Sequence, residues 1–468
     1  MRVEQIYTKC LAQGAYYIES NGEAAIIDPL RDPRPYIELA ENANAKIKYV
    51  FETHIHADFV SGHLDLATKT GATIVFGSEA KTKYNCYKAV DGEIFKIGRI
   101  KIKIIHTPGH TLESVTYLLI DERGENHAIF SGDTLFLGDV GIPDVAQQYK
   151  NLSKEKLAEM LYDSLRKKIM PLSDKIIVYP GHGAGSACGK NLSKKTVGTL
   201  GEQKKTNYAL RSNMTKDEFV SEILDGIGKP PQYFKENIIL NKSGCNAFEK
   251  VLKNGNKPLR LDEFERLMSE KGALVLDVRT QKEFIESHIS GSMFIGLDGN
   301  FAPWVGALIS NISQPIILVV SEGRSSEAVM RLARVGYDNT LGYLKGGIEV
   351  WKNNGKPWSK IPSITANELE NAIKNNPPKI LDVRKKSEFS KMHLIGEFVE
   401  NIPLSDISSK IKSIDLKKEF YIHCASGYRS VIAASILKAK GIENVVDIKG
   451  GFQSIKQTNV AVQTGTCN

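Results

Sequence analysis

The stretch "FETHIHADFVSGH", from Phe51 to His63, decides the fold of the N-terminal half of the chain. It follows an apolar run that is typical of a β-strand, and it places metal-binding side chains at alternate positions, His54, His56 and Asp58. In layered α/β folds, functional sites are assembled where strands end and loops begin. The pattern therefore predicts a metal-binding loop at the end of a strand.

Three later fragments carry the same residue types and also follow predicted strands. Any one of them alone would be a weak signal, but four fragments in this order predict a single metal site. The three are "HTPGHT" with His110, "SGDTLF" with Asp133, and "YPGHGAGSACG" with His182 and Cys188.

Residues 1–240 alternate short β-branched runs with helical patterns, which indicates a layered α/β domain. Helical periodicity is clearest over residues 34–43. The predicted strands are 23–29, 47–54, 72–77, 100–110, 113–120, 127–133 and 174–183.

With these four fragments in this order, residues 1–240 resemble the metallo-β-lactamase fold, an αββα sandwich with its site at one edge. Within that fold they are most similar to persulfide dioxygenases and to glyoxalase II hydrolases. The first resemblance implies an oxidoreductase, and the second implies a thioester hydrolase.

Phe59 separates the two expectations. Binuclear members carry a histidine directly after the aspartate of the loop, and that histidine binds the second metal with Asp58, Asp133 and His182. Here the position is a phenylalanine, which offers no donor, and burying a divalent charge beside an apolar ring is costly. We therefore expect a single metal.

For one metal, the resemblance to persulfide dioxygenases implies His54, His110 and Asp133 as ligands of one Fe(II) per chain. Two imidazoles and one carboxylate leave positions open for O2 and substrate. His56, Asp58 and His182 would then support the ligands or face the substrate. The alternative is a zinc site that also uses His56 and activates water for hydrolysis.

Cys188 and Ile142 bear on the substrate. Cys188 is either a small buried thiol or a thiol that relays sulfane sulfur at the site. Ile142 stands about where glutathione-specific relatives carry a basic residue, so the thiol carrier stays open between glutathione, coenzyme A and others.

After a polar segment over residues 241–258, interpreted as a linker, the sequence repeats. "LDVRTQKEF" and "LDVRKKSEF" lie 105 positions apart, so that Asp277 matches Asp382. We therefore predict two copies of one small, doubly wound parallel α/β domain, over residues 259–360 and 361–468.

In the second copy, the strand "FYIH" is followed by the six-residue loop "CASGYR", which resembles the loop of rhodanese sulfurtransferases. Loop amides at a helix N-terminus stabilise a thiolate or persulfide, which makes Cys424 the predicted nucleophile. Arg429 would add positive charge, and Ala425, Ser426, Gly427 and Tyr428 would form the rest of the loop. Counting back 105 from Cys424 gives Val319 in "VVSEGRSS", so the first copy is predicted to be inactive.

Composition sets the remaining expectations. The chain has 468 residues, 41% of them hydrophobic, and a mild net charge of +8, with no nucleic-acid motif, signal peptide or membrane-spanning run. The six scattered cysteines predict free thiols rather than disulfides. We expect a soluble, cytoplasmic protein that oxidises a low-molecular-weight thiol persulfide with O2 and exchanges sulfur with sulfite and thiosulfate; homo-oligomerisation stays open.

Overall fold

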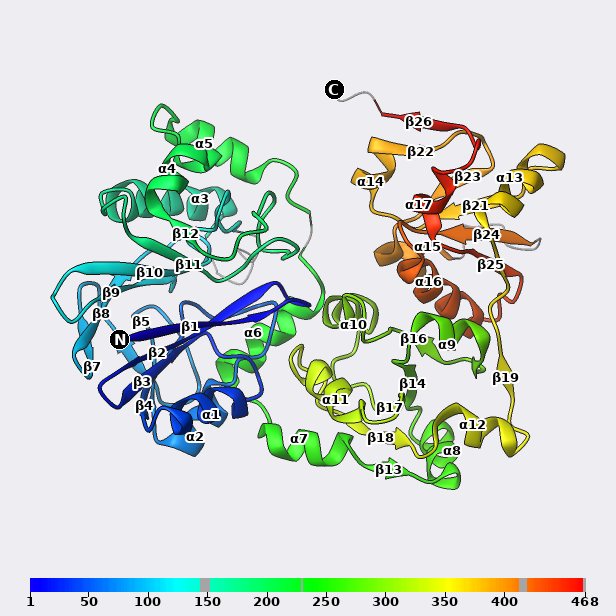
Figure 1. The fold of residues 1–468 in the computed structure, drawn as a ribbon, viewed down its shortest axis with the longest axis horizontal. Helices are drawn as coiled ribbons and strands as arrows, with labels where there is room; N and C mark the ends of the chain where they lie inside the picture. Colours follow the sequence, from blue (N-terminus) through cyan, green and yellow to red (C-terminus); the bar gives the residue numbers. More distant parts are fainter. Residues whose placement is uncertain (144–151, 229, 412–418, 466–468) are drawn as a thin grey trace. The chain divides into compact units, whose positions relative to one another are not determined.

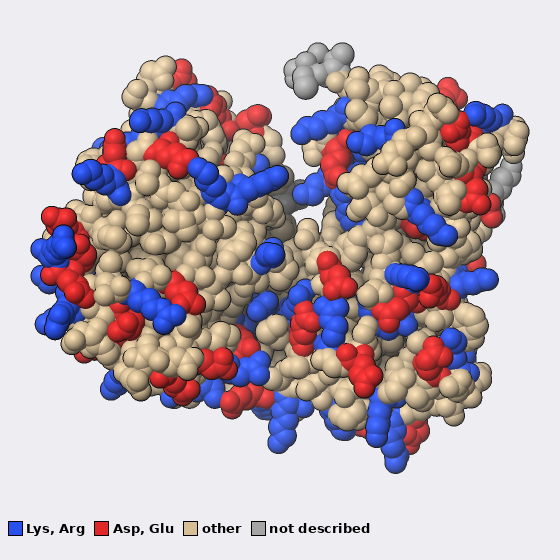
Figure 2. Space-filling model, in the orientation of Figure 1, with Lys and Arg blue, Asp and Glu red and all other residues tan. Residues whose placement is uncertain are grey.

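The computed structural model describes residues 1–143, 152–228, 230–411 and 419–465. The chain divides into two compact units, residues 1–250 with 330–337, and residues 251–329 with 338–468. Cys467 and the last residues of the second predicted repeat lie outside the described residues. On the face that Figure 2 shows, basic and acidic side chains alternate, as the small net charge suggests.

The first unit contains two six-stranded sheets packed face to face, with helices outside them (Figure 1). The first sheet has the order β1-β2-β3-β4-β5-β6, and the second has the order β12-β11-β10-β9-β8-β7. Their strands are β1 Arg2–Thr8, β2 Gln13–Ser20, β3 Glu23–Ile27, β4 Lys46–Phe51, β5 Thr73–Gly77, β6 Tyr87–Ala89, β7 Ile94–Ile97, β8 Ile100–His106, β9 Val115–Ile120, β10 Asn126–Gly132, β11 Ile177–Pro180 and β12 Gly198–Thr199.

Aromatic and β-branched side chains fill the space between these sheets. Tyr16, Phe51, Tyr117 and Phe130 are almost fully buried there, and their rings approach at 4.9–5.0 Å in the pairs Phe51–Tyr117 and Tyr16–Phe130. Such pairs add to the stabilisation that burial of apolar area provides. The αββα sandwich predicted from the sequence is thus confirmed.

Helices cover the outer faces of both sheets. Helices α1 and α2 lie against the first sheet, and α3, α4 and α5 lie beyond the second (Figure 1). The segment predicted as a linker is largely helical, because α6 extends to Ser243 and α7 follows it. The helices are α1 Arg34–Asn42, α2 His63–Thr70, α3 Lys154–Ser164, α4 Leu200–Thr206, α5 Lys216–Leu224, α6 Tyr233–Ser243 and α7 Phe248–Gly255.

The second unit holds two five-stranded parallel sheets of identical order, β13-β18-β17-β14-β16 and β20-β25-β24-β21-β23. The predicted pair of small parallel α/β domains is confirmed. The first sheet contains β13 Pro258–Leu259, β14 Leu274–Asp277, β16 Met293–Phe294, β17 Ile316–Val319 and β18 Thr340–Leu344; the second contains β20 Ser363–Ile364, β21 Lys379–Asp382, β23 Val399–Asn401, β24 Phe420–His423 and β25 Val445–Ile448.

Helices and short ribbons complete each copy. The first copy has α8 Leu261–Glu270, α9 Gln281–Glu286, α10 Phe301–Leu308, α11 Ser325–Ala333 and α12 Gly347–Asn353, with the ribbon β15 His288–Ile289 and β19 Trp358–Ser359. The second has α13 Ala366–Asn375, α14 Lys386–Lys391, α15 Ile407–Lys410, α16 Tyr428–Ala439 and α17 Gly451–Ile455, with the ribbon β22 Met392–Leu394 and β26 Val462–Thr464. Among the described residues, no helix is both long and apolar enough to cross a membrane.

Candidate metal centre and sulfur-transfer loop

Four strand ends meet at one edge of the sandwich and supply the predicted metal ligands. His54 follows β4, His110 follows β8, Asp133 directly follows β10, and His182 follows β11. The loops approach so closely that a Cβ on Gly181 would come within 2.5 Å of an Asp133 carboxylate oxygen. A glycine is required there so that the loop after β11 can lie against the aspartate.

His54, His110 and Asp133 form a buried group whose ligand atoms all lie within 4.8 Å of one another. His110 Nε2 is 3.5 Å from Asp133 Oδ2, and Nδ1 of His110 lies 2.7 Å from the carbonyl oxygen of Ile142. With Nδ1 donating to that carbonyl, Nε2 is left as a lone-pair donor.

This donor set fits a cation. Both carboxylate oxygens of Asp133 are buried without a hydrogen-bond partner among the described residues, and a buried carboxylate without compensation is costly. Burial and the neighbouring histidines hold the pKa of His54 well below its usual value, so its imidazole is neutral and able to bind a metal. A metal-binding site of histidine and aspartate is therefore present; these residues do not by themselves distinguish iron from zinc.

His56 lies beside this group but is held by other carboxylates. Its Nε2 is 3.0 Å from Asp28 Oδ1 and 3.1 Å from Glu52 Oε2. Burial by itself would lower the pKa of His56, but Asp28 and Glu52 outweigh it and raise that pKa well above the usual value. Its other ring nitrogen, Nδ1, is buried without a partner among the described residues, and it could bind a metal only after losing the proton that the raised pKa favours.

Phe59 stands at the position where binuclear members of the fold carry the histidine that binds the second metal. Its side chain is fully buried, and its ring stacks on that of His56 with centroids 4.3 Å apart. The ring thus fills space beside His56 with carbon atoms that cannot bind a cation.

A second buried group lies next to the first and contains Cys188. The ligand atoms of Asp58, His182 and Cys188 lie within 4.8 Å of one another, and His182 Nε2 is 3.5 Å from Asp58 and 3.7 Å from Asp133. Every residue expected to support the centre therefore lies at it, and Cys188 brings a thiol to this second group. Their chemical roles remain predictions.

The sequence analysis missed Asp28 and Glu52. Asp28 also accepts hydrogen bonds from the backbone N–H and the hydroxyl of Thr53, and Glu52 accepts one from Ser61 and lies 3.0 Å from His63 Nδ1. Asp28 has a positive φ of 50°, unusual for an aspartate. The only sequence signal was that each acid lies near the end of a predicted strand, 23–29 or 47–54.

The loop of the second copy has the geometry of an anion-binding turn. Cys424 is almost fully buried, and its sulfur accepts a hydrogen bond of 3.1 Å from the backbone N–H of Gly427. Gly427 has φ +111°, which a residue with a side chain rarely adopts, and α16 begins directly after it. Arg429 forms a two-pronged ion pair with Glu388 at 2.6 and 2.8 Å.

The structure corrects the prediction of which residue in the first copy corresponds to Cys424. Strand pairing aligns Asp277 with Val319 in the first copy and Asp382 with His423 in the second. The offset between copies is therefore 104 at this strand, and Val320, not Val319, occupies the cysteine position. The count of 105 was wrong because the residue lost between the repeats lies before this strand, not after it.

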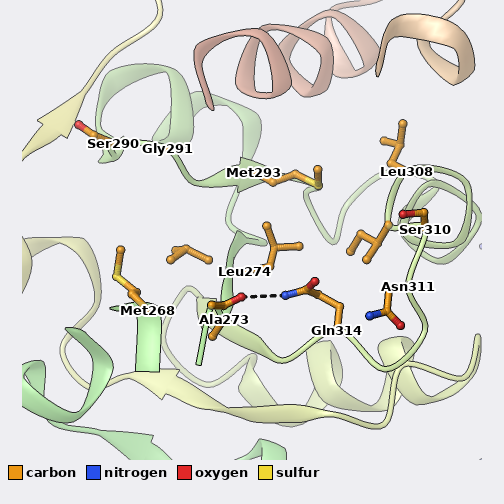
Figure 3. A pocket seen from close by; sticks show the side chains of 13 residues that line it. Met268, Ala273, Leu274, Ser290, Gly291, Met293, Leu308, Ser310, Asn311 and Gln314 are labelled. Atoms are coloured by element: carbon orange, nitrogen blue, oxygen red, sulfur yellow. Dashed lines mark hydrogen bonds between the residues drawn. The ribbon is translucent and has the colours of Figure 1, made fainter. Parts of the chain in front are cut away.

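Figure 3 shows a separate hollow in the first copy. It has a volume of about 470 Å³ and includes Met268, Leu274, Met293 and Leu308, with Gln314 donating a hydrogen bond to the Gly272 carbonyl. Leu274 begins β14, so the hollow lies at the amino ends of the parallel strands. The loop that corresponds to the cysteine loop follows the opposite ends, and the hollow is therefore not its substrate site.

Comparisons with known proteins agree with these two architectures. Residues 9–182 match the metallo-beta-lactamase superfamily, and residues 260–354 and 365–458 match the rhodanese-like domain. A solved metallo-beta-lactamase from Staphylococcus aureus subsp. aureus COL is 33% identical, covering 74% of this chain and 98% of its own, with a TM-score of 0.64. The chain belongs to the metallo-β-lactamase superfamily.

Two curated relatives each match less than half of this chain. The cytoplasmic hydroxyacylglutathione hydrolase of Arabidopsis thaliana is 35% identical over 38% of this chain, and this chain spans 66% of its length. Hydroxyacylglutathione hydrolase GloC of Haemophilus influenzae is 28% identical over 45% of this chain and 99% of its own. Their names agree with the glyoxalase II alternative better than with a persulfide dioxygenase.

Proposed function

We propose that the chain is a mononuclear iron persulfide dioxygenase coupled to a sulfurtransferase. The observation that carries this proposal is Phe59, fully buried and stacked on His56 at the position where binuclear hydrolases need a histidine. With the second metal disfavoured, the His54, His110 and Asp133 group remains as a facial set of two imidazoles and one carboxylate.

In this proposal, His54, His110 and Asp133 would hold Fe(II), which when bound supplies the activation of O2. The chain's own groups have the remaining tasks. The Ile142 carbonyl orients His110, Asp28 and Glu52 orient His56, and Asp58, His182 and Cys188 line the side of the site where Phe59 excludes a second cation. Overall, a thiol persulfide, O2 and water give the thiol and sulfite with release of two protons.

The second step of the proposal belongs to Cys424. A persulfide on Cys424 transfers its outer sulfur to sulfite, so that an S–S bond breaks, a new S–S bond forms in thiosulfate, and the Cys424 thiolate is regenerated. The Gly427 amide supports the negative sulfur at 3.1 Å, and the N-terminus of α16 adds a favourable dipole. The rhodanese match of residues 365–458 supports this assignment.

A second candidate is a zinc thioester hydrolase of glyoxalase II type fused to a rhodanese, and the names of the curated relatives favour it. The unpartnered Nδ1 of His56 is the structural feature in its favour, because it offers a further imidazole ligand. Under this candidate the metal, when bound, would supply the activation of water for hydrolysis, and Cys424 would act independently.

Metal content measured together with two activities separates the candidates. We expect the purified full chain to hold one iron and to consume O2 with glutathione or coenzyme A persulfide. Two zinc ions per chain, with hydrolysis of a glutathione thioester and no O2 uptake, would replace the proposal by the second candidate. Asp133→Ala should lose both metal and oxidation, whereas the exposed Asp217→Ala serves as its control.

A substitution of Phe59 directly tests the observation on which the proposal rests. Phe59→His should raise the zinc bound under zinc loading from one towards two ions per chain, because Asp58, Asp133 and His182 already lie together. Phe59→Leu is the matched control, since it opens space without adding a donor. A stoichiometry of two in the unaltered chain would remove the reason for preferring the dioxygenase.

A further inference from the structure

The cysteine loop of the second copy packs against the first copy inside the second unit. The Tyr428 hydroxyl donates a hydrogen bond of 2.7 Å to the carbonyl oxygen of Gly296, 132 residues away. About two turns further along α16, Ser435 Oγ accepts a bond of 3.0 Å from the backbone N–H of Phe294. Figure 1 shows α16 running beside β16 and α9 of the first copy.

The cysteine loop and the first copy approach each other closely at two points. Gly299 has no room for a Cβ, which would overlap the ring of Tyr428. A Cβ on Gly427 would come within 2.6 Å of the side-chain nitrogen of Gln281. We call the surface made by Gln281, Gly296 and Gly299 the cradle.

The loop of the first copy that lacks a cysteine stabilises this cradle. Arg324 lies in the loop that lacks a cysteine, and its guanidinium donates to Asp298 at 2.8 Å and to Glu327 at 2.9 Å. Asp298 sits between the two glycines of the cradle. The arginine of the inactive loop therefore holds in place the segment to which Tyr428 is hydrogen-bonded.

Gly427 links this contact to the nucleophile. Its N–H donates to the Cys424 sulfur at 3.1 Å, and the next residue along the chain is Tyr428. We expect a displacement of the tyrosine ring to shift the Gly427 backbone and so to lengthen the bond from its N–H to the sulfur. Hydrogen bonds weaken steeply with such changes in distance and angle.

We propose that the catalytically inactive copy is a positioning element for the Cys424 loop, with Tyr428 as the positioning residue, the cradle as its seat and Arg324 as the brace. The inference rests on the proposed sulfurtransferase role of Cys424 only for its effect on turnover. The placement of the thiol can be measured without that role.

The charged groups around Cys424 are set apart from the cradle. Arg429 and Glu388 pair with one another, Asp447 accepts a hydrogen bond from Ser430 beneath the loop, and His423 and Arg384 lie near Asp382. Changes confined to the cradle leave all of these in place. A shift in the titration of Cys424 in such variants then reports the amide geometry and not a lost charge.

Two variants test the seat in the full chain. Tyr428→Phe removes the hydroxyl that bonds to Gly296, and Gly299→Ala adds the methyl group that displaces the ring. We expect the pH profile of Cys424 alkylation by iodoacetamide to move to higher pH in both, and kcat for thiosulfate-to-cyanide transfer to fall about two- to tenfold, the range of one hydrogen bond. The KM for thiosulfate should change less than kcat.

Tyr343→Phe is the control for a lost hydroxyl. Tyr343 lies in β18, and its hydroxyl has no assigned hydrogen bond among the described residues. Arg324→Ala should reproduce the shift more weakly, with the exposed Arg266→Ala as its control. An unchanged alkylation profile and an unchanged kcat in Tyr428→Phe overturn the inference, whether or not Gly299→Ala folds. If the profile shifts but Cys424→Ser retains full transfer activity, the positioning stands and the proposed sulfurtransferase role of Cys424 fails.

Discussion

The two rhodanese copies have the same sheet order but opposite prospects for chemistry. Both keep the buried ion pair that follows the second strand of the repeat, Asp277 with Arg279 and Asp382 with Arg384, each with a closest distance of 2.6 Å. Their loops differ, because Val320 replaces the cysteine and Ser325 takes the position of Arg429. The fold is maintained by the buried core and its ion pairs, whereas the proposed sulfur transfer depends on the six residues of the loop.

The charges at the two loops differ as well. In the second copy Arg429 pairs with Glu388 from α14, close to the cysteine. In the first copy Arg324 turns to Asp298 and Glu327, and Ser321 approaches Glu283 at 3.4 Å. The first loop thus uses its arginine for internal bracing, and the second keeps one at the place where an anionic sulfur compound would bind.

The largest effect is expected from the residue that distinguishes the copies. Cys424→Ser should reduce thiosulfate-dependent sulfur transfer by at least about a thousandfold, because a serine hydroxyl stays protonated at neutral pH. Product chromatography after thiol labelling should show sulfite accumulating where the unaltered chain makes thiosulfate. Metal content and O2 uptake should persist, and Ser321→Ala in the first copy is the matched control. Undiminished thiosulfate formation would show that sulfur passes through another cysteine, and Cys188 would be the first candidate.

The converse change should fail. Val320→Cys in a Cys424→Ser background places a thiol at the corrected position of the first copy, yet we expect no measurable transfer. Ser325 supplies no charge there, and Arg324 is engaged with Asp298 and Glu327. Adding Ser325→Arg should recover part of the transfer rate. Recovery by Val320→Cys alone would show that the loop backbone suffices and that the copies differ less than their charges suggest.

A few-fold effect is expected at Glu388. Glu388→Gln keeps an acceptor for the backbone N–H of Lys385 but removes the charge that neutralises Arg429. The KM for thiosulfate should fall about two- to fivefold at low salt and approach that of the unaltered chain at high salt, since the pair is partly exposed. Steady-state kinetics at two ionic strengths measure this. Glu400→Gln, at a partly buried acid that pairs with Lys379, should leave KM unchanged, and an equal effect there would point to general charge rather than to the pair.

The last effect concerns stability and leaves turnover aside. Strand register places Asp447 opposite Ile422 as Tyr343 stands opposite Leu318, so a buried acid in the active copy replaces a tyrosine in the inactive one. Burial raises the pKa of Asp447 to about 6, although the Ser430 hydroxyl and Lys449 act in the opposite direction. Because the folded pKa exceeds the unfolded one, the stability it contributes is complete below about pH 4 and is lost as pH rises through about 6.

Asp447→Asn should therefore remove this dependence. Relative to the unaltered chain, the variant should gain stability of the order of 1–3 kcal/mol between pH 5 and pH 7.5. Hydrogen exchange of peptides from β25 and α16 measures the change locally. A variant whose difference from the unaltered chain is the same at both pH values would show that Asp447 does not titrate between them, contrary to the prediction.

Much of the fold could be predicted because burial leaves a local pattern. The strands β3, β4, β5, β8, β9, β10 and β11 coincide with the predicted runs, since alternating and continuous apolar residues encode which faces are buried. Strands β1 and β2 were missed although they pair over seven positions. Their sequences, such as "RVEQIYT", mix polar residues with apolar ones because β1 is an edge strand that is largely only half-buried.

By itself, the sequence determined which residue types stand at the strand ends, that the C-terminal half is a repeat, and that only one copy carries a cysteine. Tertiary structure alone decided that His56 turns to Asp28 and Glu52, that Cys188 meets Asp58 and His182, and that Tyr428 rests on Gly296. The physical reason is that periodicity records burial within a segment, whereas these contacts join side chains from different elements. Which ring nitrogen or thiol meets which partner depends on how those elements pack together.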